Sequence, residues 1–249
     1  MGRNLDQYFH TYRQHEFENV QAHYRRKKVL EIIAGLSPDS ILEVGSGNHP
    51  LFTDIEMFDR FGVVEPADGF FQEAVLLKQQ LPEKTQEKIT LHHTNFETYA
   101  YHTKDTFDLI VISGLLHEVE LPEKILEAAA HICTASTIVH VNVPNAYSFH
   151  RMLAVSAGLI PSVFTPSVSQ QQLQQHHTFD MDALSALVIK SGFTIVDQGS
   201  YFLKPFTHSQ LQQMLMNNII DKKILDGLFA LADQFPLNGS EIFVNIKLS

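Results

Sequence analysis

The sequence predicts an α/β fold in which a mostly parallel sheet is covered by helices on both faces, as a three-layer sandwich. Two observations predict it. Short apolar runs typical of buried strands alternate along the chain with segments whose apolar residues recur at helical spacing. Strands that alternate with helices are joined by right-handed crossovers, which give a parallel sheet. The length of 249 residues lies between one and two average domains, and we expect a single domain over residues 1–249.

The first 38 residues predict a helical cap. Apolar residues recur at helical spacing up to Leu36, and Gly35 and Pro38 close the helix. A series of buried strands and helices follows over residues 40–145. Strands are predicted at residues 41–44, 61–64, 109–112 and 137–143, and a helix at residues 122–133.

The last hundred residues differ in composition. Residues 145–180 contain two prolines and a glutamine-rich run, which is typical of a mobile connection or lid. Asp180 can cap a helix that Gly192 ends. A strand at residues 194–201, a long helical stretch and a final strand at residues 241–248 complete the part from 180 to 249. The final strand alternates apolar residues as if one face were better buried.

Composition excludes several classes of protein. Lys plus Arg is 18 and Asp plus Glu is 28, a formal charge of −10, so nucleic acid is not an expected partner. No apolar run approaches the length of a membrane span, about 18 residues, so membrane insertion is not expected. The single Cys133 forms no internal disulfide, and the amino terminus lacks the apolar core of a signal peptide. We therefore expect a cytoplasmic location.

No metal site is predicted. The histidine pairs at residues 92–93 and 176–177 are adjacent in sequence and lack the spacing of a helical metal clamp.

A glycine-rich loop is the strongest local signal for a ligand. The strand at residues 41–44 runs into Gly45, Ser46 and Gly47, where the backbone can turn sharply and a ligand can approach without meeting a Cβ atom. Glu65 ends the next strand, 22 residues after Glu43, where an acid can accept the hydroxyls of a ribose. The alternatives are a simple turn, and an acid placed at a helix amino terminus before Pro66.

The nature of the loop favours a cofactor without phosphates. Nicotinamide sites prefer a third glycine where this chain has Pro50, and the Glu43 carboxylate would repel a pyrophosphate. S-adenosylmethionine has no phosphate and carries a sulfonium and an ammonium, which suit an acidic pocket.

With these motifs, residues 40–249 resemble the class I S-adenosylmethionine-dependent methyltransferases. The loop at Glu43, Gly45 and Gly47 resembles the family's first motif, and Glu65 falls where its ribose-binding acid lies. Residues 95–97 follow a strand at 89–93 and resemble the adenine-binding segment, and residues 107–114 resemble the fourth-strand motif. Residues 143–145 resemble a segment of the small-molecule branch, which includes ubiquinone-type and sugar methyltransferases.

The resemblance implies a Rossmann-like sheet of seven strands whose last strand is antiparallel, with residues 40–145 as the cofactor-binding half. It implies S-adenosyl-L-methionine as cofactor. The residues that it places around the cofactor are Glu43, Gly45, Ser46, Gly47, Glu65, Pro66, Asn95, Phe96, Ser113 and Gly114.

One motif departs from the family's pattern. The small-molecule branch usually reads Leu-Glu-His-Val after the fourth strand, whereas this chain has His117 before Glu118. Either residue can serve as the catalytic base, and one of them can instead cap the helix that begins near Pro122. Asn145, His150 and Arg151 follow the fifth strand and are candidates for the acceptor pocket, since open α/β sheets bind ligands at that edge.

These observations together predict methyl transfer from S-adenosylmethionine to a small-molecule hydroxyl of a sugar, a quinone-like compound or a natural product. An NAD(P)-dependent oxidoreductase and a catalytically inactive cofactor-binding partner protein are the alternatives. The charged run at residues 24–28 is either a solvated helix face or brings Tyr24 or Arg25 over the cofactor. The oligomeric state is left open, and a homodimer is compatible with the sequence.

Overall fold

The computed structural model describes residues 16–167, 170–171 and 175–249. Residues 1–15 of the predicted helical cap and part of the glutamine-rich run lie outside the described residues.

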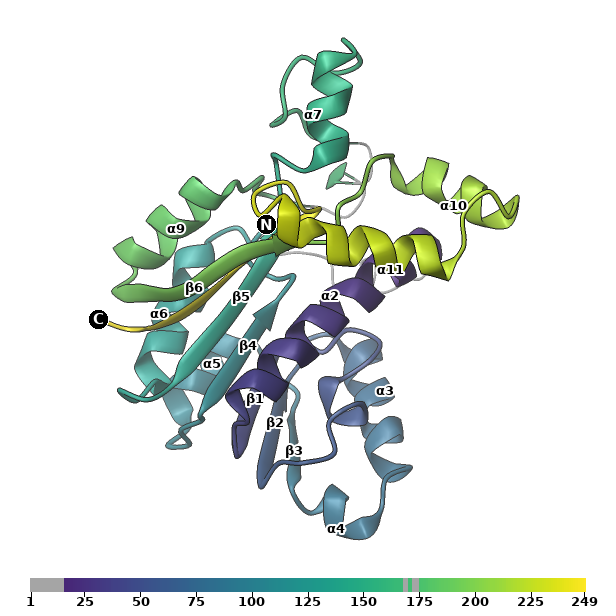
Figure 1. The fold of residues 1–249 in the computed structure, drawn as a ribbon. Helices are drawn as coiled ribbons and strands as arrows, with labels where there is room; N and C mark the ends of the chain where they lie inside the picture. Colours follow the sequence, from purple (N-terminus) through teal and green to yellow (C-terminus); the bar gives the residue numbers. More distant parts are fainter. Residues whose placement is uncertain (1–15, 168–169, 172–174) are drawn as a thin grey trace.

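Seven strands form one twisted sheet (Figure 1). Their order is β3-β2-β1-β4-β5-β7-β6. Strands β1 to β5 are parallel, and β7 runs antiparallel to both of its neighbours, β5 and β6. The predicted mixed sheet with an antiparallel last strand is therefore confirmed. The strands are β1 (Ser40–Val44), β2 (Arg60–Val64), β3 (Ile89–His92), β4 (Leu109–Ser113), β5 (Ile138–Pro144), β6 (Phe193–Tyr201) and β7 (Glu241–Leu248).

Helices cover both faces of the sheet. One face carries α5 (Phe96–His102), α6 (Pro122–Ile132) and α9 (Met181–Lys190), and the other carries α2 (Glu16–Leu36) and α3 (Asp68–Gln79). The sheet is apolar on both sides because alternate residues of each strand face opposite layers. In β4, Ile110 and Ile112 pack toward α5 and α6, whereas Leu109 and Val111 pack toward α2. This packing explains the continuous apolar runs in the sequence.

The remaining helices lie near the carboxyl ends of the parallel strands. They are α7 (Phe149–Ser156), α10 (His208–Met216) and α11 (Lys222–Leu231), and Figure 1 shows α7 rising beyond the end of β5. The helical stretch predicted before the last strand is divided into α10 and α11, and Asn218 between them adopts a positive φ of 53°. The short helices α4 (Glu83–Gln86), η1 (Leu51–Thr53) and η2 (Ala232–Gln234) lie in connections.

The final strand is buried on both faces over most of its length, whereas the alternation in its sequence predicted one better-buried face. Ile242, Val244 and Ile246 lie in the core under α6 and α9, and Phe243 lies in a separate cluster with Tyr24. Both faces are covered because α6 and α9 pack on one side of β7, and α2 and α11 pack on the other. Across the described residues, no helix is long and apolar enough to cross a membrane.

Candidate active site

A large cavity lies at the carboxyl edge of the sheet, where β1 and β4 are neighbours and their crossovers diverge to opposite sides. Ligands bind at this switch point in open α/β sheets. The cavity volume is about 1480 Å³, larger than the roughly 300–1,000 Å³ of most single-ligand pockets, so it has room for two ligands. Every residue predicted for the site lines it: Glu43, Gly45, Ser46, Gly47, Glu65, Pro66, Asn95, Phe96, Ser113, Gly114, His117, Glu118, Asn145, His150 and Arg151.

The glycine-rich loop leaves open space above its backbone. Gly45 and Gly47 have φ values of 79° and 54°, a conformation that favours glycine. A Cβ atom at either position would meet no atom within 4 Å. The loop is held at its start by the amide of Gly45, which donates to the carbonyl of Val64 at the end of β2. A ligand can therefore approach the backbone here.

The side chain of Glu65 holds the glycine-rich loop in place. Its carboxylate accepts hydrogen bonds from the amides of Ser46 at 2.9 Å, Gly47 at 3.3 Å and Ala67 at 2.9 Å. Burial raises the pKa of Glu65, and these amide donors oppose the rise. The acid does not simply sit at a helix amino terminus, since α3 begins only at Asp68.

Glu43 also holds the loop, from its other side. Its Oε2 accepts from the amide of Leu51 at 2.9 Å. Burial raises the pKa of Glu43 to about 8, and the hydrogen bond from Leu51 and the charge of Arg26 act in the opposite direction. Burial therefore favours the protonated form of Glu43, whereas an ionised carboxylate was expected from the sequence.

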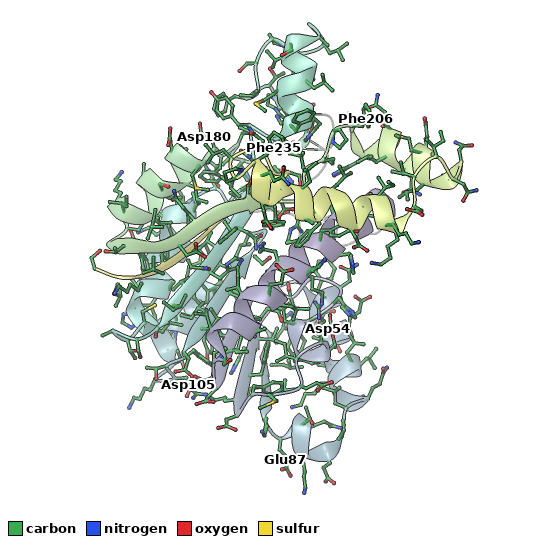
Figure 2. All side chains as sticks on the ribbon, viewed as in Figure 1. Asp54, Glu87, Asp105, Asp180, Phe206 and Phe235 are labelled. Atoms are coloured by element: carbon green, nitrogen blue, oxygen red, sulfur yellow. The ribbon has the colours of Figure 1, made fainter. Side chains whose placement is uncertain are left out.

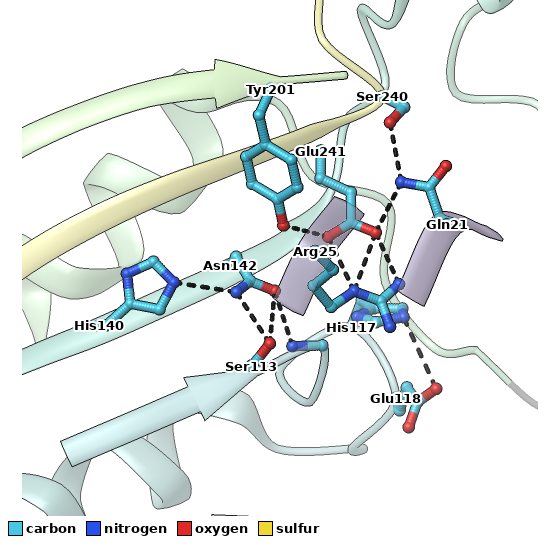
Figure 3. Close-up of polar contacts among 11 residues, drawn as sticks. Gln21, Arg25, Ser113, His117, Glu118, His140, Asn142, Tyr201, Ser240 and Glu241 are labelled. Carbon is cyan, nitrogen blue, oxygen red and sulfur yellow. Dashed lines mark hydrogen bonds and ion pairs between the residues drawn. The ribbon is translucent and has the colours of Figure 1, made fainter. Parts of the chain in front are cut away.

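A chain of hydrogen bonds holds the loop that begins with Ser113 and Gly114 at the end of β4 (Figure 3). Asn142 Oδ1 accepts from the amide of Gly114 at 3.0 Å, and Asn142 Nδ2 lies 2.9 Å from Ser113 Oγ and 3.0 Å from His140 Nε2. His140 Nδ1 lies 2.8 Å from Asn245 Oδ1. Burial lowers the pKa of His140 to about 4, so the ring is neutral and donates through Nδ1. The end of β4 is thus tied to β5 and β7.

Arg25 reaches the same loop from α2. Its Nη1 lies 3.3 Å from the position that a Cβ atom on Gly114 would take. Its guanidinium donates to both carboxylate oxygens of Glu241, which also accept from Tyr201 and Gln21 (Figure 3). Burial pushes the pKa of Glu241 upward, but the Arg25 charge and these donors bring it below its ordinary value. Glu241 is therefore ionised.

Of the two side chains considered as a cover for the cofactor, only Arg25 lies at the cavity. Tyr24 is buried away from it, where its ring stacks on Phe202 at 4.4 Å and its hydroxyl donates to Asp226.

His117 and Glu118 lie together on the turn after β4. His117 Nε2 is 3.7 Å from Glu118 Oε1, both side chains are buried, and both line the cavity (Figure 3). The helix α6 begins at Pro122 after its N-cap residue Leu121, so neither His117 nor Glu118 occupies the cap position. The pair is placed at the cavity, where a base for the acceptor would have to be.

Two of the three residues predicted for the acceptor pocket also hold the backbone. Asn145 donates to the carbonyls of Leu237 and Gly239 and accepts from the amide of Tyr147. Arg151 donates to the carbonyl of Val163 and to further oxygens of the same segment. Both residues line the cavity, but these contacts fix the backbone around it.

Comparison with known proteins identifies the family. A family model described as a methyltransferase domain matches residues 17–198, which is most of the chain. The chain belongs to the methyltransferase domain family. This match confirms the predicted S-adenosylmethionine-dependent methyltransferase and favours methyl transfer over the alternative of a nicotinamide oxidoreductase.

Solved structures resemble this methyltransferase in fold. The plantazolicin methyltransferase BamL, in complex with a triazolic desmethylPZN analogue and S-adenosylhomocysteine, has a TM-score of 0.60 at 13% identity, with 93% of this chain and 88% of that chain covered. A possible histamine N-methyltransferase from Thermotoga maritima has a TM-score of 0.58 at 14% identity, with 96% and 99% covered. The N-methyltransferase NodS from Bradyrhizobium japonicum, with S-adenosylhomocysteine, has a TM-score of 0.56 at 10% identity, with 96% and 90% covered. A search of curated proteins finds no match.

The cavity is also lined by residues that were not predicted from the sequence. They line the same cavity and are Gln21, Lys204, His208, Ser240 and Glu241. Glu241 is the first residue of β7 and pairs in register with Pro144 at the end of β5. Because β7 is antiparallel to β5, its first residue lies at the carboxyl edge of the parallel strands. The antiparallel last strand, which the sequence predicted, could therefore have indicated Glu241. Gln21, Lys204 and His208 belong to no motif. Among the described residues, no group of three or more potential ligands could hold a metal ion.

Proposed function

We propose that this methyltransferase transfers the methyl group of S-adenosylmethionine to an oxygen atom of a small molecule. The observation that carries the proposal is that one cavity of about 1480 Å³ is lined by the glycine-rich loop and by the buried His117–Glu118 pair. The cofactor and the acceptor would therefore meet in the same cavity.

The residues at the glycine-rich end fit S-adenosylmethionine. The open space above Gly45 and Gly47 accommodates a ligand against the backbone, and the buried Glu65 is suited to the hydroxyls of a ribose. Within the described residues, the one hydrogen bond of the Asn95 side chain is that which its Oδ1 accepts from the amide of Thr98. Its amide protons would therefore serve an adenine ring beside the buried Phe96. Pro66, Ser113 and Gly114 complete the proposed cofactor contacts. The cofactor supplies an activated methyl group on a sulfonium.

The protein's own part in the reaction is mainly to orient the reactants. Transfer needs the acceptor atom in line with the methyl carbon at about 3 to 3.5 Å, and a closed cavity that excludes water favours this geometry. A hydroxyl acceptor must also lose a proton. His117 and Glu118 lie at the cavity and can take that proton, either one directly or through their contact at 3.7 Å.

A sugar, a quinone-like compound or a natural product is the acceptor class that the resemblance of residues 143–145 supports. The segment 145–180, proposed as a lid, contributes His150 and Arg151 to the cavity. A cytoplasmic location and a homodimer remain proposals. The alternative of an inactive cofactor-binding partner predicts binding of the cofactor without turnover.

The test uses methyl-labelled S-adenosylmethionine with a panel of hydroxylated small molecules. We expect label on an acceptor oxygen. His117→Asn and Glu118→Gln should both retain affinity for S-adenosylhomocysteine, and the variant that removes the base should lower kcat by about 10²- to 10⁴-fold. Label on nitrogen in every product would contradict the proposed oxygen transfer. Cofactor binding with no label on any acceptor would favour the inactive partner protein.

A further inference from the structure

Four basic side chains gather at one part of the cavity. His150 and Arg151 lie in the first turn of α7, Lys204 follows β6, and His208 is the first residue of α10. All four line the cavity, although they come from three separate elements. Lys204 is only 5% exposed. We call these four residues the basic cluster.

Lys204, His208 and Arg151 are all close enough to His150 to affect its titration. The pKa of His150 lies well below its ordinary value because of burial first, and then because of the charges of Lys204, His208 and Arg151. Every charged group that acts on His150 is therefore basic. Its Nδ1 is buried and has no hydrogen-bond partner among the described residues. That nitrogen remains available to a ligand.

Arg151 is not neutralised by an acid in the described part of the chain. Its donors reach the carbonyls of Val163 and Thr165 and the side-chain oxygen of Gln170, all of which are neutral. Burial lowers the pKa of Arg151, and no carboxylate opposes that effect. A partly buried cation without a counter-ion is costly, so an anion in the cavity would be favoured here.

Three of the acids that line the cavity are engaged at other places. Glu43 and Glu65 hold the glycine-rich loop at the ends of β1 and β2, and Glu241 is paired with Arg25. The whole chain has only 18 Lys and Arg residues against 28 acids. A basic cluster inside the cavity of such an acidic protein is thus a local feature that its overall charge does not explain.

We propose that the methyl acceptor carries an oxyanionic group, a carboxylate or a phosphate, which the basic cluster binds. This inference rests on the proposed function, since it places the acceptor in the methyltransferase cavity. Arg and Lys are the side chains that recognise such groups by charge-assisted hydrogen bonds. Anchoring the anion at the cluster would hold the rest of the acceptor in a fixed position relative to the methyl group.

Calorimetry with simple anions tests the inference. The protein is first titrated with S-adenosylhomocysteine, and the loaded protein is then titrated with inorganic phosphate and, separately, with benzoate. We expect one of the two anions to bind, and Arg151→Gln and Lys204→Gln to weaken that binding by at least about tenfold. Arg151→Lys keeps the charge and should retain most of the affinity. The exposed Lys223→Gln serves as the matched control and should change nothing.

The outcomes separate the two proposals. Tighter binding of phosphate or of benzoate identifies which oxyanion the cluster prefers. If neither anion binds the loaded protein, or if Lys204→Gln, Arg151→Gln and Lys223→Gln bind equally well, the inference is overturned. If S-adenosylhomocysteine itself does not bind, the proposed function fails instead, whatever the anions do. Thermal melting of each variant identifies those that do not fold, and His208→Gln replaces any that fail.

Discussion

Arg25 and Glu241 form a buried ion pair across 216 positions of the chain, with Nη2 of Arg25 2.6 Å from Oε1 of Glu241. Their side chains are 16% and 2% exposed. Because Arg25 belongs to α2 and Glu241 begins β7, the pair joins the first described helix to the last strand beside Gly114. One wall of the cavity therefore depends on a contact between the two ends of the described chain (Figure 2 draws the described side chains on the ribbon).

Replacing Arg25 should destabilise the protein strongly. Arg25→Met leaves Glu241 as a buried charge without its partner, which should lower the free energy of unfolding by about 3–5 kcal/mol in urea denaturation. The control is Lys124→Met, which breaks the exposed pair with Glu127 and should cost far less stability because that pair is solvated. Equal losses in the two variants would contradict the importance of the buried pair.

Neutralising Glu43 should change how stability depends on pH. The pKa of Glu43 rises from its ordinary 4.5 to about 8, so the folded protein binds more protons than the unfolded chain between these values. The free energy of unfolding should therefore fall as the pH rises from 4.5 to about 8, by about 1.4 kcal/mol for each pH unit. Glu43→Gln keeps an oxygen for the Leu51 amide and removes the buried charge.

Denaturation at pH 5 and pH 9 measures this effect. We expect Glu43→Gln to gain stability relative to the parent protein between the two conditions, and the exposed Glu87→Gln to show no such gain. A parent protein and a Glu43→Gln variant with the same pH dependence would show that Glu43 does not titrate in this range.

The Asn142 side chain should matter for cofactor affinity because it holds the amide of Gly114. Asn142→Leu removes that anchor, and we expect it to weaken S-adenosylhomocysteine binding by about tenfold in calorimetry. Thr137→Val is the matched control, since it also removes a buried hydrogen bond, to the carbonyl of Phe107, at the opposite end of β5. Unchanged affinity in Asn142→Leu, or an equal loss in Thr137→Val, would argue against an anchoring role.

Asn145 should act mainly on stability. Asn145→Ala removes the bonds to Leu237, Gly239 and Tyr147 and leaves the buried carbonyl of Gly239 unpaired, which should cost about 1–3 kcal/mol of unfolding free energy. Affinity for S-adenosylhomocysteine should change by less than about threefold, because those bonds lie away from the glycine-rich loop. A large loss of affinity with little loss of stability would instead indicate a direct contact with a ligand.

The sheet and the cofactor end of the cavity could be predicted from the sequence because each has a local pattern. Buried strands are short apolar runs, and the loop at Gly45 and Gly47 needs two glycines at fixed spacing. The strand boundaries were right to within one or two residues. The conformations of single residues between α10 and α11, such as Asn218, leave no such pattern.

The partners of the site residues could not be predicted because they depend on contacts distant in sequence. Nothing near Asn145 indicates that its side chain would bind the backbone at residues 237 and 239. Strand β7 is antiparallel to both β5 and β6, so β5 and β6 run in the same direction and end at the same edge of the sheet. Lys204 follows the end of β6 and reaches the cavity for this reason. Likewise, the raised pKa of Glu43 follows from its depth of burial rather than from its neighbours in sequence.

The most direct measurement is calorimetric titration of the purified protein with S-adenosylmethionine, S-adenosylhomocysteine and NADH, with Gly47→Asp beside the parent chain. Gly47 has a positive φ and faces open space, so an aspartate there would strain the loop and intrude on the proposed cofactor position. We predict that both adenosyl ligands bind the parent protein in the micromolar range and that Gly47→Asp abolishes this binding. Binding of NADH with no heat from either adenosyl ligand would contradict the methyltransferase assignment.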